Sequence, residues 1–328
     1  MKILFLLLSL TLFTSCFSEK KLIQIQGETM GTYYKVTTYG TETNAELKED
    51  IDTFLRLFNN VFSTYISSSE ISKINQSKFE KIKLSDSMNK IMQLSMDISA
   101  KSLGYFDISV GPLVNAWGFG PDGKKKEPST EEIKNLLTHT GFSKITVDDK
   151  WIERPIGMYL DLSAIAKGFG VDELVKFLEF RGHGQLLVEI GGEVRTRGKK
   201  QDGASWKVGI EGPGKKRGEK LVKVVALVDK SMATSGSYRN YLKYGDKVFN
   251  HTINPKTGRP IEHKTLSVSV ITDYCADADA WATALMSMGH KKALDLANKL
   301  DLSVFIQYKE NDQIKTVQSK SFMKEFTK

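Results

Sequence analysis

The stretch that most constrains this chain is YLDLSAIAKGFGVD, from Tyr159 to Asp172. Its first residues are typical of the end of a strand. From Ala164 onward the spacing of apolar residues at i, i+3, i+4 and i+7 predicts a helix with one buried face. Gly168 and Gly170 lie near the start of this helix, where each costs about 1 kcal/mol relative to alanine. Two glycines at such a position indicate that something must approach the helix backbone closely.

Two interpretations of this helix start remain open. In the first, the absent side chains expose backbone N–H groups to an anion such as phosphate, which the helix N-terminus and the charge of Lys167 both favour. Asp161 and the backbone oxygens of the turn are then suited to a hard cation beside it. In the second, a crossover helix packs tightly on a sheet through its glycines. Neither GxxxxGK[ST] nor the dinucleotide fingerprint is present, because Glu173 stands where the latter requires glycine.

A second polar cluster runs from Cys275 to Thr283. Asp277 fits the N-cap of a predicted helix, and Asp279 and Thr283 are spaced i, i+4, so both oxygens lie on one helical face. A carboxylate and a hydroxyl among small alanines suit Mg²⁺, which prefers oxygen ligands and keeps waters or phosphates. The alternative is an acidic first turn that satisfies the helix dipole, with Thr283 merely packed. Cys275 is expected to be a small buried residue, since a thiolate is a poor ligand for Mg²⁺.

His251 lies in a stretch whose two prolines and Gly258 indicate a loop. A single histidine is usually structural. Near a phosphate site it can instead act as a general base, because its pKa is close to working pH.

The N-terminus has the layout of an export signal. Lys2 precedes eleven residues, Ile3 to Phe13, that are apolar or hydroxyl-bearing, a run too short to span a bilayer. The small residue before Cys16 resembles a bacterial lipobox, although Phe13 stands where leucine is usual. We expect a signal peptide over residues 1–15, a lipidated Cys16 and a tether over residues 16–21. An ordinary signal peptide cut nearby is the alternative. Because Cys16 carries the lipid, Cys275 is then the only free cysteine of the mature chain, which excludes an intramolecular disulfide.

Composition is ordinary for a globular protein, with 40% apolar and 26% charged residues among 328. The net charge of +8 is scattered over lysines, with short runs in segments that resemble solvated loops. No signature of a nucleic-acid-binding module is present, and export argues against such a role. The positive charge is better suited to attracting anionic ligands or lipids.

The pattern of elements predicts an α+β fold. Gln24 to Tyr39 alternates as two strands, Glu46 to Phe62 is a clear amphipathic helix, and further hairpins and separate helices follow. This order argues against a doubly wound parallel sheet. We expect one unit over residues 22–328 with mixed, largely antiparallel sheets and packed helices.

Taken together, these pieces are more specific than any one of them, and the chain resembles the ApbE family of FAD:protein FMN transferases, which are typically exported lipoproteins. The matching motifs occur in the family order and cover essentially all of the mature chain. They are Met30–Thr32, Phe62–Tyr65 with Ser69–Ser72, Phe106–Ile108 with Gly111–Val114, Asp161–Gly168, Glu189–Glu193, Ala233–Gly236, His251–Pro255 with Thr257–Gly258, and Asp279–Leu285.

The resemblance implies a T-fold-like single catalytic unit and a role for each matching residue. Asp279, Thr283 and the backbone carbonyl of Ala164 would hold Mg²⁺, with Asp277 assisting from outside the ligand set. His251 matches the histidine proposed as the base of the reaction. The residues that would line the FAD site are Met30, Tyr65, Phe106, Asp107, Asp161 and Lys167.

The implied reaction is Mg²⁺-dependent transfer of FMN from FAD to a threonine or serine hydroxyl of an acceptor flavoprotein, with release of AMP. Asp279 would act in it through the metal. Subunits of membrane redox pumps with an exported flavin domain are the expected acceptors. The expected location is a bacterial membrane, with the protein lipid-anchored and facing the periplasm from the inner membrane or its equivalent. Two alternatives stay open: an FAD pyrophosphatase that gives FMN and AMP, and a non-catalytic FAD-binding lipoprotein.

Overall fold

The structure is a computed structural model that describes residues 20–121, 127–214, 220–237, 241–245 and 247–326. The expected signal peptide and the expected lipidation site, Cys16, lie outside these residues. Strand β1 begins at Lys21, the last residue of the expected tether. Among the helices of the described residues, none has the length and apolar character needed to cross a bilayer.

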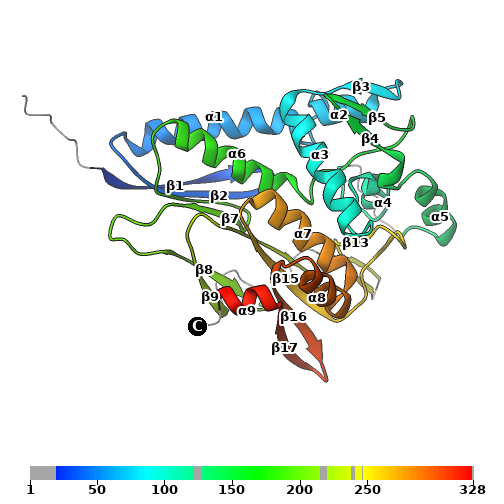
Figure 1. Cartoon of the computed structure of the whole chain (residues 1–328). Coiled ribbons are helices and arrows are strands. Elements are labelled where there is room, and N and C mark those ends of the chain that lie inside the picture. The colour runs from blue at the N-terminus through cyan, green and yellow to red at the C-terminus, as the bar shows by residue number, and fades with distance from the viewer. Residues whose placement is uncertain (1–19, 122–126, 215–219, 238–240, 246, 327–328) are drawn as a thin grey trace, which may run out of the picture.

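An eight-stranded antiparallel sheet forms the centre of the molecule (Figure 1). Each strand pairs with its neighbour in antiparallel register, which confirms the predicted fold class. The strands, in spatial order, are β1 (Lys21–Thr29), β2 (Thr32–Gly40), β6 (Leu186–Ile190), β7 (Glu193–Arg197), β10 (Ser231–Gly236), β15 (Thr265–Thr272), β16 (Ser303–Glu310) and β17 (Gln313–Gln318).

Two groups of helices pack beside the sheet (Figure 1). Helices α1 (Asn44–Phe62) and α6 (Ala166–Phe180) share one apolar core with β1, β2 and β6. Helices α3 (Asp86–Lys101), α7 (Cys275–Met288) and α8 (His290–Lys299) share a second core with β15 and β16. The predicted apolar stripe of α1 is buried, and a capping box between Thr43 and Glu46 starts the helix.

The opposite side of β15 and β16 is covered by a smaller layer. Ile271 and Phe305 pack there against a hairpin and a C-terminal helix, so β15 is buried on both faces. The elements of this layer are β8 (Trp206–Glu211), β9 (Leu221–Leu227) and α9 (Lys320–Phe326).

The remaining elements of the described chain are short. They are α2 (Glu70–Gln76), the 3₁₀ helices Ile108–Val110 and Phe142–Lys144, α4 (Gly111–Ala116), α5 (Thr130–Thr138), the small sheet of β3 (Lys81–Lys83), β5 (Trp151–Glu153) and β4 (Thr146–Asp148), and the hairpins β11 (Tyr241–Tyr244) with β12 (Lys247–Asn250) and β13 (Ile253–Asn254) with β14 (Arg259–Pro260).

The segment before α6 differs from its prediction. Residues 158–162 are extended but belong to no strand, and the helix begins at Ala166 rather than Ala164. A side chain replaces the missing strand partner: the amide of Asn75 accepts from the N–H of Leu160 at 2.8 Å and donates to its carbonyl at 2.9 Å. Because this segment pairs with a side chain, it stays outside the sheet and leads directly into the site.

Candidate active site

The site is built where α6 crosses α7 at Gly168. A Cβ atom at Gly168 would lie 2.3 Å from the carbonyl oxygen of Cys275 and 2.8 Å from Cβ of Asp279, so only glycine allows this approach. A Cβ atom at Gly170 would meet the side chain of Met30 at 2.8 Å. Both glycines therefore serve tight packing, as the second interpretation predicted, although α7 and Met30 rather than the sheet are in contact with them.

This packing aims a carboxylate at the helix start. The backbone N–H of Gly168 donates to Oδ2 of Asp279 at 3.0 Å. The first helical bond of α6 runs from the N–H of Phe169 to the carbonyl of Ile165. In a helix that began earlier, the N–H of Gly168 would donate to the carbonyl of Ala164. Here that N–H donates to Asp279 instead, and the Ala164 carbonyl lies before the first helical hydrogen bond of α6.

Lys167 connects two buried carboxylates at this point. Its Nζ lies 2.9 Å from Oε1 of Glu193 on β7 and 3.6 Å from Oδ1 of Asp279. Burial opposes the charged ammonium, but the carboxylates of Asp279 and Glu193 outweigh it and raise the pKa of Lys167. Burial raises the pKa of Glu193, and Lys167 counteracts this. Oε2 of Glu193 is buried without a hydrogen-bond partner among the described residues.

The start of α7 is capped by a residue of α6. Asp172 accepts from the N–H groups of Cys275 and Ala276, each at 2.9 Å, and pairs with Arg195 of β7. The prediction that Asp277 is the N-cap is therefore wrong: the helix begins at Cys275, and Asp277 lies inside the first turn. Asp172 supplies the cap from another helix, so no local acid is needed. Burial and then the charge of Asp172 raise the pKa of Asp277 to about 6.

The donor set near Lys167 fits a small hard cation. Asp279 and Thr283 lie one turn apart on α7, as predicted, and the Ala164 carbonyl lies just before α6. The partnerless carboxylate oxygen of Glu193 adds a fourth oxygen to this region. In the described part of the chain, no group of three or more His, Cys, Asp or Glu side chains has metal-binding geometry. The predicted ligand set consists of one backbone carbonyl, one hydroxyl and one carboxylate. Only the carboxylate belongs to these four residue types, so the predicted set would not form a group of three. The metal roles of Ala164, Asp279, Thr283 and Asp277 stay predictions.

Two further acids lie on neighbouring segments and are held by local hydrogen bonds. Asp107 accepts from the N–H and hydroxyl of Ser109 and from the N–H of Phe142, at 2.6–2.8 Å. Asp161 accepts from the N–H of Ser163 at 2.8 Å, and its own N–H donates to the carbonyl of Ile108 at 2.7 Å. Burial raises the pKa of both carboxyl groups. Asp107 thus shapes the turn that supports Asp161.

Aromatic residues lie beside Asp161. Tyr65 is 70% exposed, and its hydroxyl donates to the carbonyl of Phe119 at 3.4 Å. Partial desolvation of the phenol by its neighbours, followed by the charge of Asp161, raises the pKa of Tyr65. The ring of Phe119 meets the ring of His251 edge-on, with 6.4 Å between centroids. Tyr65 and His251 therefore both contact Phe119, and Asp161 lies close enough to Tyr65 for its charge to act on the phenol.

The remaining predicted residues belong to the same region. Phe106 is buried in the apolar core that includes residues of α7. Any part that it has in ligand binding is therefore to pack beneath the residues that line the site. Met30 occupies the β1–β2 turn with a left-handed φ of 50° and reaches α6 at Gly170. The loop that carries His251 continues into β13, which contacts α7.

Sequence reasoning missed two residues, Glu193 and Asp172. The sequence signal that points to Glu193 is the pair Gly191-Gly192 directly before it. In the structure these glycines have φ angles of 65° and 111°, which turn β6 directly back into β7 and fix the position of Glu193.

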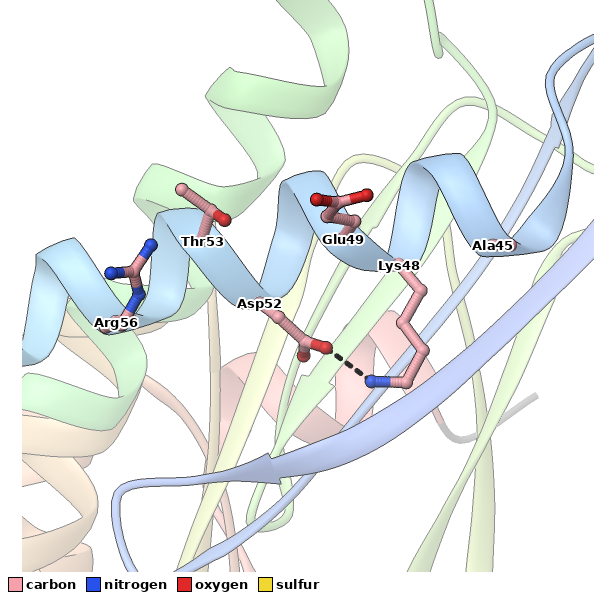
Figure 2. Close-up of a pocket in the computed structure, with 6 residues that line it drawn as sticks. All are labelled: Ala45, Lys48, Glu49, Asp52, Thr53 and Arg56. Carbon is pink, nitrogen blue, oxygen red and sulfur yellow. Dashed lines mark hydrogen bonds and ion pairs between the residues drawn. The ribbon is translucent and has the colours of Figure 1, made fainter.

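A shallow hollow of about 440 Å³ lies away from this site, on the solvent side of α1 (Figure 2). Six residues of that single helix line it, and Lys48 and Asp52 form an ion pair within it. None of the predicted site residues lines the hollow. Because one helix forms its whole wall, it is an open surface and unsuited to enclosing a flavin nucleotide.

Comparison with known proteins gives a consistent result. The model of the ApbE family matches residues 30–306. A FAD:protein FMN transferase of Escherichia coli K12 is 37% identical over 307 residues, covering 91% of this chain and 87% of that protein. One from Haemophilus influenzae is 36% identical and covers 94% and 93%. The crystal structure of Pseudomonas stutzeri flavinyl transferase ApbE in its apo form has a TM-score of 0.86 at 31% identity and covers 94% and 98% of the two chains.

Proposed function

The chain belongs to the ApbE family and is a transferase, and we propose that it transfers FMN from FAD to a threonine or serine hydroxyl of an acceptor flavoprotein, releasing AMP. The observation that carries this proposal is the cluster of Lys167, Asp279 and Glu193 against the N-terminal turn of α6. One cation and two carboxylates at a helix start are arranged to hold a pyrophosphate together with a divalent cation.

In this proposal Asp279, Thr283 and the Ala164 carbonyl would hold Mg²⁺, with Asp277 assisting from outside the ligand set. When bound, the ion would supply positive charge that offsets the negative charge of the pyrophosphate. Lys167 contributes a permanent positive charge, because its raised pKa keeps the ammonium protonated throughout the physiological range. Transfer of a phosphoryl group depends mainly on such positioning and electrostatic stabilisation.

The aromatic group around Phe119 is proposed to hold the isoalloxazine end of FAD. Tyr65 presents a largely exposed ring, and Met30 adds an apolar surface at the β1–β2 turn. In this proposal His251, which meets Phe119 edge-on, takes the proton of the attacking hydroxyl. The phosphorus–oxygen bond to AMP breaks as the acceptor oxygen bonds to the FMN phosphorus.

We also propose that the protein is exported and anchored to a bacterial membrane through lipid on Cys16. The support is the apolar run of residues 3–13 followed by a small residue and cysteine. Acceptors at that membrane, such as redox-pump subunits with an exported flavin domain, would then share its compartment.

Product analysis tests the reaction. The chain from Ser18 onward, which contains all described residues, is incubated with FAD, Mg²⁺ and a candidate acceptor domain, and the acceptor is weighed. A gain of one FMN together with released AMP supports the transferase. Free FMN and AMP beside an unmodified acceptor, repeated with several acceptors, would identify an FAD pyrophosphatase. Stoichiometrically bound, unchanged FAD would identify a binding protein without catalysis.

A further inference from the structure

Three segments meet where the described chain begins. Lys20 donates from Nζ to the carbonyl of Gly182, just after α6, at 3.3 Å. Gln201, in the connection between β7 and β8, donates to the carbonyl of Lys20 at 3.0 Å. The start of β1, the end of α6 and the β7–β8 connection thus form one end of the molecule (Figure 1). We call it the α6-end surface and define it by Lys20, Lys21, Leu22, Phe180, Lys199 and Lys200.

This surface exposes apolar side chains that the fold does not explain. Phe180, the last residue of α6, is 93% exposed, the highest value among the large apolar residues of the described chain. Leu22 is 54% exposed on the first strand. A phenylalanine that is 93% exposed loses the free energy that burial would give, so this position would gain from contact with an apolar phase outside the monomer.

Lysines lie on the same segments as these apolar side chains. No carboxylate lies within ion-pair distance of Lys20, Lys21 or Lys199 anywhere in the described residues. Lys200 lies over the ring of Trp206 at 5.6 Å. Asp202 is the acid of the same connection, and it accepts from the N–H of Ala204. Arg181, next to Phe180, is already paired with Asp50. Two other acids near this end are paired, Glu179 with Arg197 and Glu42 with His183. Among the described residues of these segments, lysines without a carboxylate partner therefore outnumber acids without a cationic partner, and apolar side chains on such segments suit an anionic lipid surface.

We propose that the α6-end surface is seated on the anionic surface of the membrane, with Phe180 and Leu22 entering the headgroup region. This proposal rests on the anchoring proposed above. The length of chain before the described residues supports it: only four peptide steps separate Cys16 from Lys20, and these span at most about 14 Å whatever their conformation. A bilayer that holds an acyl chain on Cys16 must therefore lie next to this end of the molecule.

Vesicle binding of the chain from Ser18 onward tests the surface without the lipid. Vesicles of equal parts phosphatidylcholine and phosphatidylglycerol are expected to bind it, and vesicles of phosphatidylcholine alone are expected to bind it weakly. Phe180→Ser is expected to weaken binding about tenfold, and Lys199→Glu with Lys200→Glu by at least about twentyfold. The matched controls are Phe79→Ser, where the ring is 75% exposed beside β3, and Lys78→Glu with Lys83→Glu in the same region. Equal losses in both sets would overturn the proposal.

A second measurement uses the full-length, lipidated protein in the same vesicles. Because Cys275 is buried, a nitroxide can be directed to Phe180→Cys or to Phe79→Cys, and the parent chain treated in the same way measures any label on Cys275. The label at 180 is expected to be shielded from a water-soluble nickel reagent, and the label at 79 is expected to stay accessible. Equal accessibility on vesicle-bound protein would reject the surface while leaving the anchor intact. Failure of Cys16 to incorporate a labelled fatty acid would reject the anchor, and vesicle binding of the Ser18 chain would still report on the surface.

Discussion

The backbone N–H of Gly168 donates to the carboxylate of Asp279 at 3.0 Å, across the contact between two helices that are far apart in sequence. This one bond links the start of α6 to the α7 face that carries Thr283. It also leaves the second oxygen of Asp279 on the side of Lys167. The geometry of the site thus depends on how closely α6 and α7 approach each other. Gly168 allows the short distance between them because it has no side chain.

Gly168→Ala is expected to lower the free energy of unfolding by about 1–3 kcal/mol and to reduce FMN transfer more than stability alone would explain. The added Cβ would meet the backbone of Cys275, which cannot move aside as a flexible side chain can. Gly184→Ala is the matched control, because nothing lies within 4 Å of its Cβ position. Denaturant unfolding and transfer rates measure both effects. Equal behaviour of the two variants would contradict the close approach.

Asp279→Asn is expected to reduce transfer about a hundredfold or more while the fold survives, because the amide oxygen can still accept from Gly168 but the charge is lost. Thr283→Val removes the neighbouring hydroxyl at nearly constant volume and is expected to raise the Mg²⁺ concentration needed for half-maximal rate. Asp273→Asn, an exposed acid paired with Lys230, serves as the control. A normal rate and Mg²⁺ dependence in Asp279→Asn would show that this residue is not a ligand.

His251→Ala is expected to slow transfer about a hundredfold with FAD affinity nearly unchanged, because it removes the proposed base and not the pyrophosphate site. Transfer rates at saturating FAD and acceptor, with FAD binding followed by fluorescence, separate the two. His139→Ala, at the exposed end of α5, controls for the loss of a histidine. An unchanged rate would reduce His251 to a structural role in its loop.

Asp172→Ala is expected to destabilise the protein by about 3 kcal/mol, because it leaves Arg195 buried without its carboxylate and two N–H groups of α7 without an acceptor. Glu173→Ala, one residue further along α6, removes an ion pair with the exposed Lys176 and is expected to cost about 0.5 kcal/mol or less. Urea unfolding of both variants gives the comparison. Similar values would mean that Asp172 does not cap α7.

Stability is expected to fall as pH drops below about 6.5, and His263 contributes to this loss. Burial lowers the pKa of His263 in the folded state, and Nε2 has no partner there among the described residues. As the pH falls, His263 therefore binds a proton in the unfolded chain before it does so in the folded chain. Its contribution to the free energy of unfolding is lost as the pH drops from its pKa in the unfolded chain to its lower pKa in the folded chain. Melting temperatures at pH 7.5 and pH 5 should differ less in His263→Gln than in the parent chain. His139→Gln should leave the difference unchanged.

Local pattern in the sequence predicted the parts of the fold that depend on local forces. The amphipathic spacing of α1, the β1–β2 hairpin and the i, i+4 placement of Asp279 and Thr283 are all confirmed. The periodicity of α1 and of the two strands reports one buried face each, which neighbouring residues alone determine. Helix α7 is buried on most sides, and there only the spacing of Asp279 and Thr283 is local information. The predicted ligand roles at the site stay predictions.

What the sequence did not disclose comes from contacts between distant segments. Asp172 caps a helix that begins 103 positions later, and a local acid, Asp277, was the better candidate by spacing alone. The Leu160 segment has the composition of a strand, but the side chain of Asn75 takes the place of a strand partner. Glu193 became part of the site only because the Gly191-Gly192 turn brings β7 beside Lys167.

One helix carries both ends of the proposed arrangement. Lys167 stands in the first turn of α6 and Phe180 is its last residue, so thirteen helical steps of about 1.5 Å set a height of at most about 20 Å between the membrane contact and the chemistry. The length of α6 therefore sets the distance between the bilayer and the site. In the proposed arrangement the acceptor presents its hydroxyl at that height above the bilayer. Lengthening the helix by two turns would lift the site by about 10 Å, while a single inserted residue would rotate Phe180 by about 100° out of the membrane plane.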